Sequence, residues 1–257
     1  MPFSRCDFSD TDLRVRIAGA HLGPAGLAGL ATAPGHSVAW DLAYQSDTQP
    51  LFLLPFRLYR TRLPRAKSLV AKPLAVFGGE LQVDGTRVGV SDWVGSQNHN
   101  WGSKHTDHYA WGQVAGFDTH PQSFLEVGTA RLKIGPLWTP FMTVLVLRHA
   151  GREIALNSLR QSLRATASFT YFTWRFSSED DAARIEGTID ASREAFVGLL
   201  YYNPPGGTKH CLNSKLASCE LRLTDKQSGT TELLATRQRA AFEILTDDRS
   251  HGVEIRV

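Results

Sequence analysis

The chain has 257 residues, of which 42% are hydrophobic and 21% are charged, a composition typical of globular proteins. This length suffices for one large domain or two small ones with a proper core. The net charge is only +3 and no run of Lys or Arg exceeds two residues, so we expect no nucleic acid partner.

Short extended segments dominate the chain from its beginning. The stretch 18–34 is rich in Gly and Pro and is interpreted as a loop, too broken for a membrane span. Asp84-Gly85 is the strongest short hairpin signal in the chain. Before the central region, strands are expected at 13–17, 37–44, 51–60, 74–83 and 87–90.

The second half of the chain continues in the same way. A turn is expected at Ala150-Gly151, and the strand Ser168–Phe176 is aromatic on both faces, so both faces should be covered. No stretch shows a sustained helical period, which favours an all-β sandwich or barrel. The later strands are expected at 123–134, 139–149, 152–157, 165–176, 183–189, 195–202, 217–223 and 232–245.

The most informative stretch is 92–117, which combines several tryptophans and histidines. Side chains alternate across a strand, so a strand starting at His105 separates two sets of residues. One face carries His105, Asp107, Tyr109, Trp111 and Gln113, and the other carries mostly small side chains. Rings beside an amide, a carboxylate and an imidazole are typical of a ligand wall. The alternative is a core strand whose polar side chains form hydrogen bonds within the protein.

Two short motifs carry a family resemblance. Residues 98–102 read Asn-His-Asn-Trp-Gly, and residues 109–112 read Tyr-Ala-Trp-Gly. This pair resembles a signature of the double-lipocalin group, which includes carotenoid 1,2-hydratase, AttH-like proteins and tocopherol cyclase. The pieces 40–42 and 77–81 are similar to its first barrel, and 213–223 and 239–245 to its second.

The resemblance implies an all-β fold of two tandem lipocalin-like antiparallel β-barrels, with an apolar small molecule as substrate. We place the first barrel at 1–92 and the second at 93–257. This chain begins close to its first Trp-Asp-Leu strand, where family members carry a longer segment, so whether the first barrel is complete stays open.

Acid-catalysed chemistry on an isoprenoid alkene needs a protonated carboxyl in an apolar setting and aromatic faces that stabilise a carbocation. Asp107 lies among aromatic residues, and Glu126 is flanked by Phe and Leu on one side and Val on the other. Asp92 and Asp41 are further candidates, and for each of these four acids the alternative is a side chain that faces solvent or pairs with an arginine. The candidate catalytic residues are Asp107, Glu126 and His99. The candidate ligand-binding residues are Trp93, Asn100, Trp101, His105, Tyr109, Trp111 and Gln113.

No cofactor or metal is expected. His99, His105 and His108 fit no standard zinc spacing, and the chain has no nucleophile elbow, phosphate loop or dinucleotide fingerprint. Three cysteines form no C-x-x-C pair, so we expect free thiols, with a Cys211–Cys219 bridge left open. The first residues resemble no signal peptide, and we expect a cytoplasmic protein with no integral membrane segment and at most transient contact with a membrane surface.

Two functions remain. The first is a cofactor-independent hydratase, cyclase or isomerase acting by acid catalysis on an apolar, isoprenoid-like molecule. The alternative is a non-catalytic lipocalin-like protein that binds an apolar ligand. A cavity-facing carboxyl at Asp107 or Glu126 without an arginine partner favours catalysis, and a purely apolar cavity favours binding. The oligomeric state is not predicted.

Overall fold

The computed structural model describes residues 3–203 and 206–256, and strands make up most of them. All the extended pairings between named strands are antiparallel, so the all-β fold class is confirmed. The chain forms two compact units: Met1–Gln49 with Lys72–Gln97, and Pro50–Ala71 with Asn98–Val257. The segment 50–71 thus packs with the later part of the chain, while the proposed barrel boundary at residue 92 stays a prediction.

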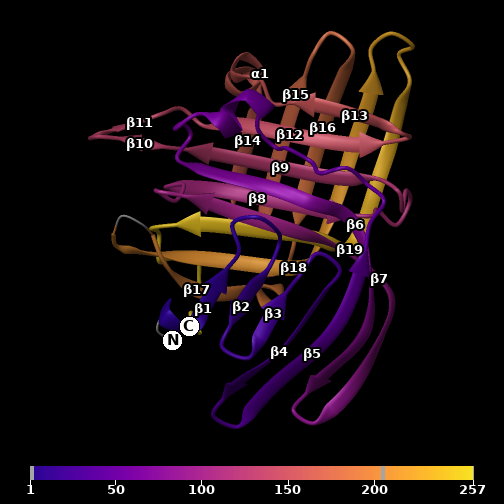
Figure 1. Cartoon of the computed structure of the whole chain (residues 1–257). Helices are drawn as coiled ribbons and strands as arrows, with labels where there is room; N and C mark the ends of the chain where they lie inside the picture. Colours follow the sequence, from indigo (N-terminus) through magenta and orange to yellow (C-terminus); the bar gives the residue numbers. More distant parts are fainter. Residues whose placement is uncertain (1–2, 204–205, 257) are drawn as a thin grey trace. The chain divides into compact units, whose positions relative to one another are not determined.

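The first sheet is a meander in which each strand pairs with the next in sequence (Figure 1). Asp84 and Gly85 both have positive φ angles, 47° and 82°, as a two-residue hairpin turn between strands requires. The hairpin prediction at this position is confirmed. The strands are β1 (Cys6–Phe8), β2 (Val15–Ile17), β3 (Ala20–Leu22), β4 (Gly26–Ala33), β5 (His36–Gln45), β6 (Ala66–Val83) and β7 (Thr86–Gly102).

The predicted loop at 18–34 is wrong, because most of it forms β3 and β4. Its small residues have a packing reason. A Cβ atom on Gly29 would lie 2.4 Å from the ring of Trp40, the residue that pairs with it on β5. Glycine here therefore makes room for a large neighbour and does not mark a break in the strand.

The second sheet holds the strands that follow β7, in the order β13-β12-β9-β8-β19-β18-β16-β15-β14, with β17 paired to β18. The long strands β18 and β19 have register irregularities between Ser214 and Cys219. The bounds are β8 (His108–Ala115), β9 (Phe124–Arg131), β12 (Met142–His149), β13 (Arg152–Leu156), β14 (Thr166–Thr170), β15 (Thr173–Glu179), β16 (Ala183–Asp190), β17 (Val197–Tyr202), β18 (Thr208–Asp225) and β19 (Thr231–Thr246). A small ribbon of β10 (Lys133–Ile134) and β11 (Leu137–Trp138) stands apart.

The core of the second unit lies between the two ends of this curled sheet. In Figure 1, β9, β12 and β13 cross in front of β15 and β16. Fully buried side chains from the two layers, such as Leu125, Leu145, Trp174 and Ile185, belong to one hydrophobic cluster. The other face of β8, β9 and β12 points away from this core, so it can carry polar side chains.

Three local predictions in this unit are corrected. The expected strand 51–60 is instead a single bridge at Leu51 followed by the 3-10 helix η2 (Phe56–Arg60), which begins after Pro55. The expected strand 165–176 is a hairpin, because the chain turns at Phe172, where φ is 87°. A short helix α1 (Leu159–Arg164) was not predicted, although Ser158 and Gln161 form a capping box that its sequence contains. Two further 3-10 turns are η1 (Phe3–Arg5) and η3 (Arg193–Ala195).

Candidate functional site

The second unit contains a cavity of about 720 Å³. Strands β8, β9 and β12 line one side, and the segment 53–69, which includes η2, lines another. Apolar lining is supplied by Leu53, Leu54, Leu58, Leu132, Met142 and Val144. The polar lining includes Asn98, Asn100, His105, Glu126, Lys215 and Glu243, and two further lysines, Lys67 and Lys104. A mostly apolar wall with a few polar groups is typical of a small-molecule site.

Strand β8 places its side chains as alternation requires. Tyr109 and Trp111 line the cavity, whereas Gln113 is buried behind it and does not line it, although its amide bonds to Glu126. The other face meets the core: a Cβ on Gly112 would lie 2.5 Å from Ile189 and 3.1 Å from Trp174. Gly112 therefore lets core side chains approach the backbone of β8 while its neighbours face the cavity.

Glu126 is the most unusual group in this cavity. It pairs with Gln113 across β8 and β9, and its side chain is 2% exposed. Its Oε1 accepts a hydrogen bond of 2.8 Å from Trp111 Nε1, and its Oε2 accepts one of 2.6 Å from Gln113 Nε2. Among the described residues no Lys or Arg forms an ion pair with it. Burial raises the pKa of Glu126 to about 7, although the bonds from Gln113 and Trp111 oppose that rise.

A second carboxylate, Glu243, lines the same cavity on the other side of Trp111. It lies directly across from Trp111 in the β8–β19 pairing and across from Asn213 in the β18–β19 pairing. Tyr109 donates its hydroxyl to Oε1, and Asn213 donates its amide to Oε2. Burial, and then the Glu243 charge, raise the pKa of Tyr109 well above 10, so this phenol stays a hydrogen-bond donor.

The indole of Trp111 is thus placed between two carboxyl groups. Its third neighbour is a cation, since the ammonium of Lys215 lies 5.3 Å from the ring centroid. Lys215 is exposed and forms no ion pair within residues 3–203 and 206–256. The cavity can therefore attract an anionic group beside an apolar one.

Asp107 has a different environment from the one expected of a proton donor. It is buried, but Lys104 Nζ lies 2.7 Å from Oδ2 and the Lys133 backbone donates to the same oxygen at 2.9 Å. Burial by itself would raise its pKa, but these two donors outweigh it and hold the pKa of Asp107 below its usual range. Asp107 does not line the cavity, and its contacts are those of a carboxylate that holds a loop together.

The other expected residues divide into two groups. Asn100, Trp101 and His105 line the cavity, with Trp101 tilted against Tyr59 at 5.9 Å between ring centroids. His99 is exposed, stacks on Trp101 at 5.2 Å between ring centroids, and is not among the residues that line the cavity.

Three further candidates from the sequence lie in the first unit. Trp93 is 50% exposed there, and Asp41 and Asp92 are also exposed. None of the three is among the residues that line the cavity of the second unit.

Metal ligation gains no support from the part of the chain that the structure describes, where no group of His, Cys, Asp and Glu could hold an ion. His108 packs against Phe141 and Phe169, away from the other histidines of its stretch. The three cysteines are free, so the Cys211–Cys219 bridge is not formed. No helix within the described residues is long and apolar enough to cross a membrane.

Glu243 was missed by the sequence interpretation, although a signal existed. It is flanked by Phe242 and Ile244 within an apolar strand, the same pattern that singled out Glu126. The segment 53–69 was also missed as a part of the site, because nothing in its sequence shows that it packs over β8 and β9.

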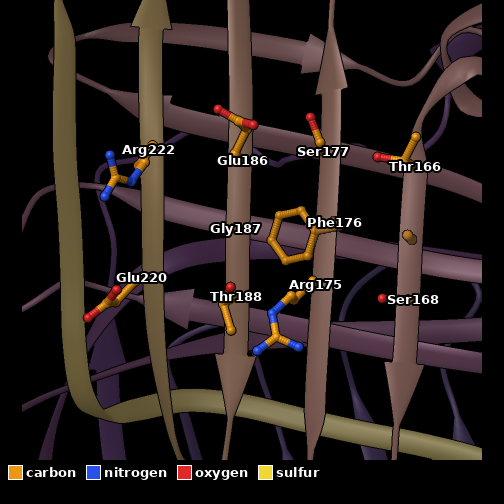
Figure 2. A pocket seen from close by; sticks show the side chains of 11 residues that line it. Thr166, Ser168, Arg175, Phe176, Ser177, Glu186, Gly187, Thr188, Glu220 and Arg222 are labelled. Atoms are coloured by element: carbon orange, nitrogen blue, oxygen red, sulfur yellow. The ribbon is translucent and has the colours of Figure 1, made fainter.

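A second hollow, of about 640 Å³, lies on the outer face of β14, β15, β16 and β18 (Figure 2). Its charged side chains alternate in sign, with Arg175 and Arg222 beside Glu186 and Glu220. The remaining polar groups are hydroxyls of Ser and Thr. This is a solvated sheet face with balanced charge, and it offers no buried group for chemistry.

Comparisons with known proteins found relatives by sequence and neighbours by structure. No family model matches the chain. Two uncharacterized proteins of Mycobacterium tuberculosis, MT0513 of strain CDC 1551 and Rv0493c of strain H37Rv, are each 28% identical over 208 residues, which cover 80% of this chain and 61% of the relative. The chain thus spans about three fifths of the length of these curated relatives.

Two solved structures share the fold. Kievitone hydratase from Nectria haematococca superposes with a TM-score of 0.53 at 10% identity, over 86% of this chain and 64% of that one. A candidate AttH protein from Nitrosomonas europaea gives 0.51 at 10% identity, over 91% and 69%. The chain therefore has the fold seen in an AttH-like protein and in a hydratase, while likeness to carotenoid 1,2-hydratase and tocopherol cyclase stays an expectation from the sequence motifs.

Proposed function

We propose that the cavity of the second unit is the active site of a cofactor-independent hydratase, cyclase or isomerase that protonates a double bond of an apolar, isoprenoid-like molecule. One observation carries this proposal. Glu126 is a buried carboxyl with a pKa of about 7 that lines an apolar cavity and has no cationic partner among the described residues. A general acid works best when its pKa lies near the working pH.

The hydrogen bonds that Glu126 accepts leave its acidic proton pointing into the cavity. The indole N–H of Trp111 can only donate, and the Gln113 amide also donates to this carboxyl. Neither group accepts the acidic proton, so the free direction is the cavity. The O–H bond of Glu126 breaks as a C–H bond forms at one alkene carbon, and positive charge develops on the other carbon. The face of the Trp111 ring stabilises such a cation.

The second carboxylate supplies the matching base. In a hydration, water adds to the cationic carbon and its proton passes to Glu243. In a cyclisation or an isomerisation, Glu243 takes a proton from a carbon next to the cation. Tyr109 and Asn213 donate to Glu243 and hold its carboxylate beside Trp111. Protons return from Glu243 to Glu126 through solvent between turnovers.

The lining supports an apolar substrate. Leucine side chains from 53–58 line one side of the cavity, and Met142 and Val144 of β12 add apolar surface to the side that carries Glu126. The fold shared with a hydratase is consistent with this chemistry, although a fold by itself supplies no substrate. No cofactor is needed in the proposal, since the carboxyl itself supplies the proton.

A binding role is the second candidate, and Lys215 is the observation that favours it. An exposed ammonium over Trp111 at the edge of an apolar cavity can hold the carboxylate of a bound fatty acid. In that case the cavity retains its ligand without changing it, and Glu126 contributes only a buried hydrogen-bonding group.

Turnover and retention distinguish the two functions. The purified protein is examined by native mass spectrometry after incubation with terpenoid alkenes and with fatty acids, and the ligands are then extracted. Hydration adds the mass of one water to the alkene, and in isotopically labelled water the product carries the label. Cyclisation or isomerisation leaves the mass unchanged and shifts the chromatographic elution of the extracted product. We expect conversion by the wild type and retention without conversion by Glu126→Gln. Retention of unchanged ligand by both proteins would instead establish a binding protein.

A further inference from the structure

The rim of the cavity carries exposed apolar side chains that have no function in the proposed chemistry. Phe56 is 55% exposed and Leu63 is 66% exposed, on the segment that lines one side of the cavity. Leu159 and Leu163 on α1 are 64% and 49% exposed, and they lie one helical turn apart. Exposed apolar groups that cluster around a cavity mark an interaction surface.

The two segments border the same cavity. Pro55, Leu58 and Pro64 line it from the first segment, and Leu159 and Ser162 line it from α1. They are also joined directly, since Asn157 donates to the Leu53 carbonyl at 2.9 Å. The exposed apolar side chains are therefore arranged around one opening.

Each of these four apolar residues has an arginine next to it in sequence: Arg57, Arg62, Arg160 and Arg164. All four arginines are exposed, and none forms an ion pair within the described residues. Elsewhere arginines do find carboxylates, as Arg148 does with Glu153 at 2.8 Å.

The sequence around the rim contains no compensating acid. No Asp or Glu occurs between Asp47 and Glu80, or between Glu153 and Glu179. Within the second unit the first interval contains Arg57, Arg60, Arg62, Arg65 and Lys67, and α1 in the second interval contains Arg160 and Arg164. The rim is therefore strongly cationic, although the whole chain has a net charge of only +3.

We infer that this rim docks on an anionic lipid surface and that the cavity exchanges its apolar ligand directly with the membrane. Apolar side chains of this kind enter the boundary between headgroups and acyl chains, while the flanking arginines contact anionic headgroups. An acidic protein would match the charges, but it would not explain why each arginine accompanies an exposed Leu or Phe at the mouth of an apolar cavity. Ile134 and Leu137 form a further exposed apolar pair on the β10–β11 ribbon, which follows the lining residue Leu132 in sequence.

Vesicle binding of the full chain tests this inference. Cosedimentation is measured with phosphatidylcholine vesicles and with vesicles that also contain phosphatidylserine, without substrate. We expect binding to the anionic vesicles only. The double variant Arg57→Gln/Arg62→Gln, and likewise Arg160→Gln/Arg164→Gln, should lower the partition coefficient about tenfold or more. Leu159→Ser/Leu163→Ser should lower it as well and leave the protein more sensitive to salt.

The matched control is Arg175→Gln/Arg222→Gln, which removes the same charge from the outer sheet face of Figure 2. We expect this control to keep wild-type binding, and thermal melts confirm that each variant is folded. Equal losses for the control and the rim variants would overturn the inference, as would the absence of vesicle binding by the wild type. Tighter binding to polyglutamate than to anionic vesicles would reassign the rim to an acidic protein. The assay involves no turnover, so its failure leaves the role of Glu126 untouched.

Discussion

The indole Nε1 of Trp111 donates a hydrogen bond of 2.8 Å to the buried carboxyl of Glu126. This bond stabilises the ionised form of the carboxyl and lowers its pKa, against the larger effect of burial. Trp111→Phe keeps an aromatic face and removes the donor, so we expect the pKa of Glu126 to rise. If Glu126 is the acid, the pH at which kcat falls on the alkaline side should shift upward. An unchanged pH profile would show that another group controls that limb.

Removing the acid should abolish catalysis while the cavity still binds. Glu126→Gln keeps the size of the side chain, and we expect kcat to fall by about 100-fold or more, as for loss of a general acid, with ligand affinity changed only a few-fold. The control is Glu186→Gln on the outer face of β16, where the carboxylate is half-buried and pairs with Arg184. Activity retained by Glu126→Gln would transfer the chemistry to another residue or support the binding role.

The same carboxyl should make stability depend on pH. Its pKa is raised from 4.5 to about 7 on folding, so the folded state holds the proton more tightly than the unfolded state. The stabilisation of the folded state by this protonated carboxyl is fully present below about pH 4.5 and is lost as the pH rises through about 7. The free energy of unfolding should fall by ~3 kcal/mol over this range. Urea unfolding at pH 5 and pH 8 should show this loss in the wild type relative to Glu126→Gln. Equal pH dependence in both proteins would mean that Glu126 ionises normally.

Two tryptophans of the second unit should respond in opposite ways to truncation. Trp111 lines the cavity, and Trp174 is fully buried in the core. We expect Trp111→Ala to weaken ligand binding at least tenfold with a small loss of stability. Trp174→Ala should cost about 3–5 kcal/mol of stability, with binding retained in the folded fraction. Denaturant titration and ligand titration on both variants make this comparison. A loss of several kcal/mol for Trp111→Ala with unchanged binding would identify it as a core residue.

Replacement of the two remaining carboxylates, Asp107 and Glu243, should have different effects on stability and on catalysis. Asp107→Asn breaks the pair with Lys104, and we expect it to lower stability by about 1–3 kcal/mol while kcat changes only a few-fold. Glu243→Gln removes the proposed base, and we expect kcat to fall by about 100-fold with ligand affinity retained. Parallel kinetics and unfolding of the two variants test both roles. A large kcat effect at Asp107 would restore it as a catalytic candidate.

Several local sequence patterns predicted features that depend on neighbouring residues, although the loop at 18–34 and the strand at 51–60 were wrong. Alternation on β8 predicted that Tyr109, Trp111 and Gln113 share a face, because successive side chains of a strand point to opposite sides. The hairpin at Asp84-Gly85 followed from backbone conformation in the same way. The apolar neighbours of Glu126 predicted a buried carboxyl, and this holds in the structure.

Only the tertiary structure decided which of these groups meet. Glu243 lies beside Trp111 because β19 pairs with β8 across more than half the chain, and no local pattern contains that register. Lys104 pairs with Asp107 and takes it out of the candidate acids, whereas Glu126, with only N–H donors around it, keeps its proton near neutral pH. By itself, the sequence determined strands, turns and one face of a site. Long-range strand pairing decided the charge state and the partners of its carboxyl groups, since both depend on burial and on neighbours distant in the chain.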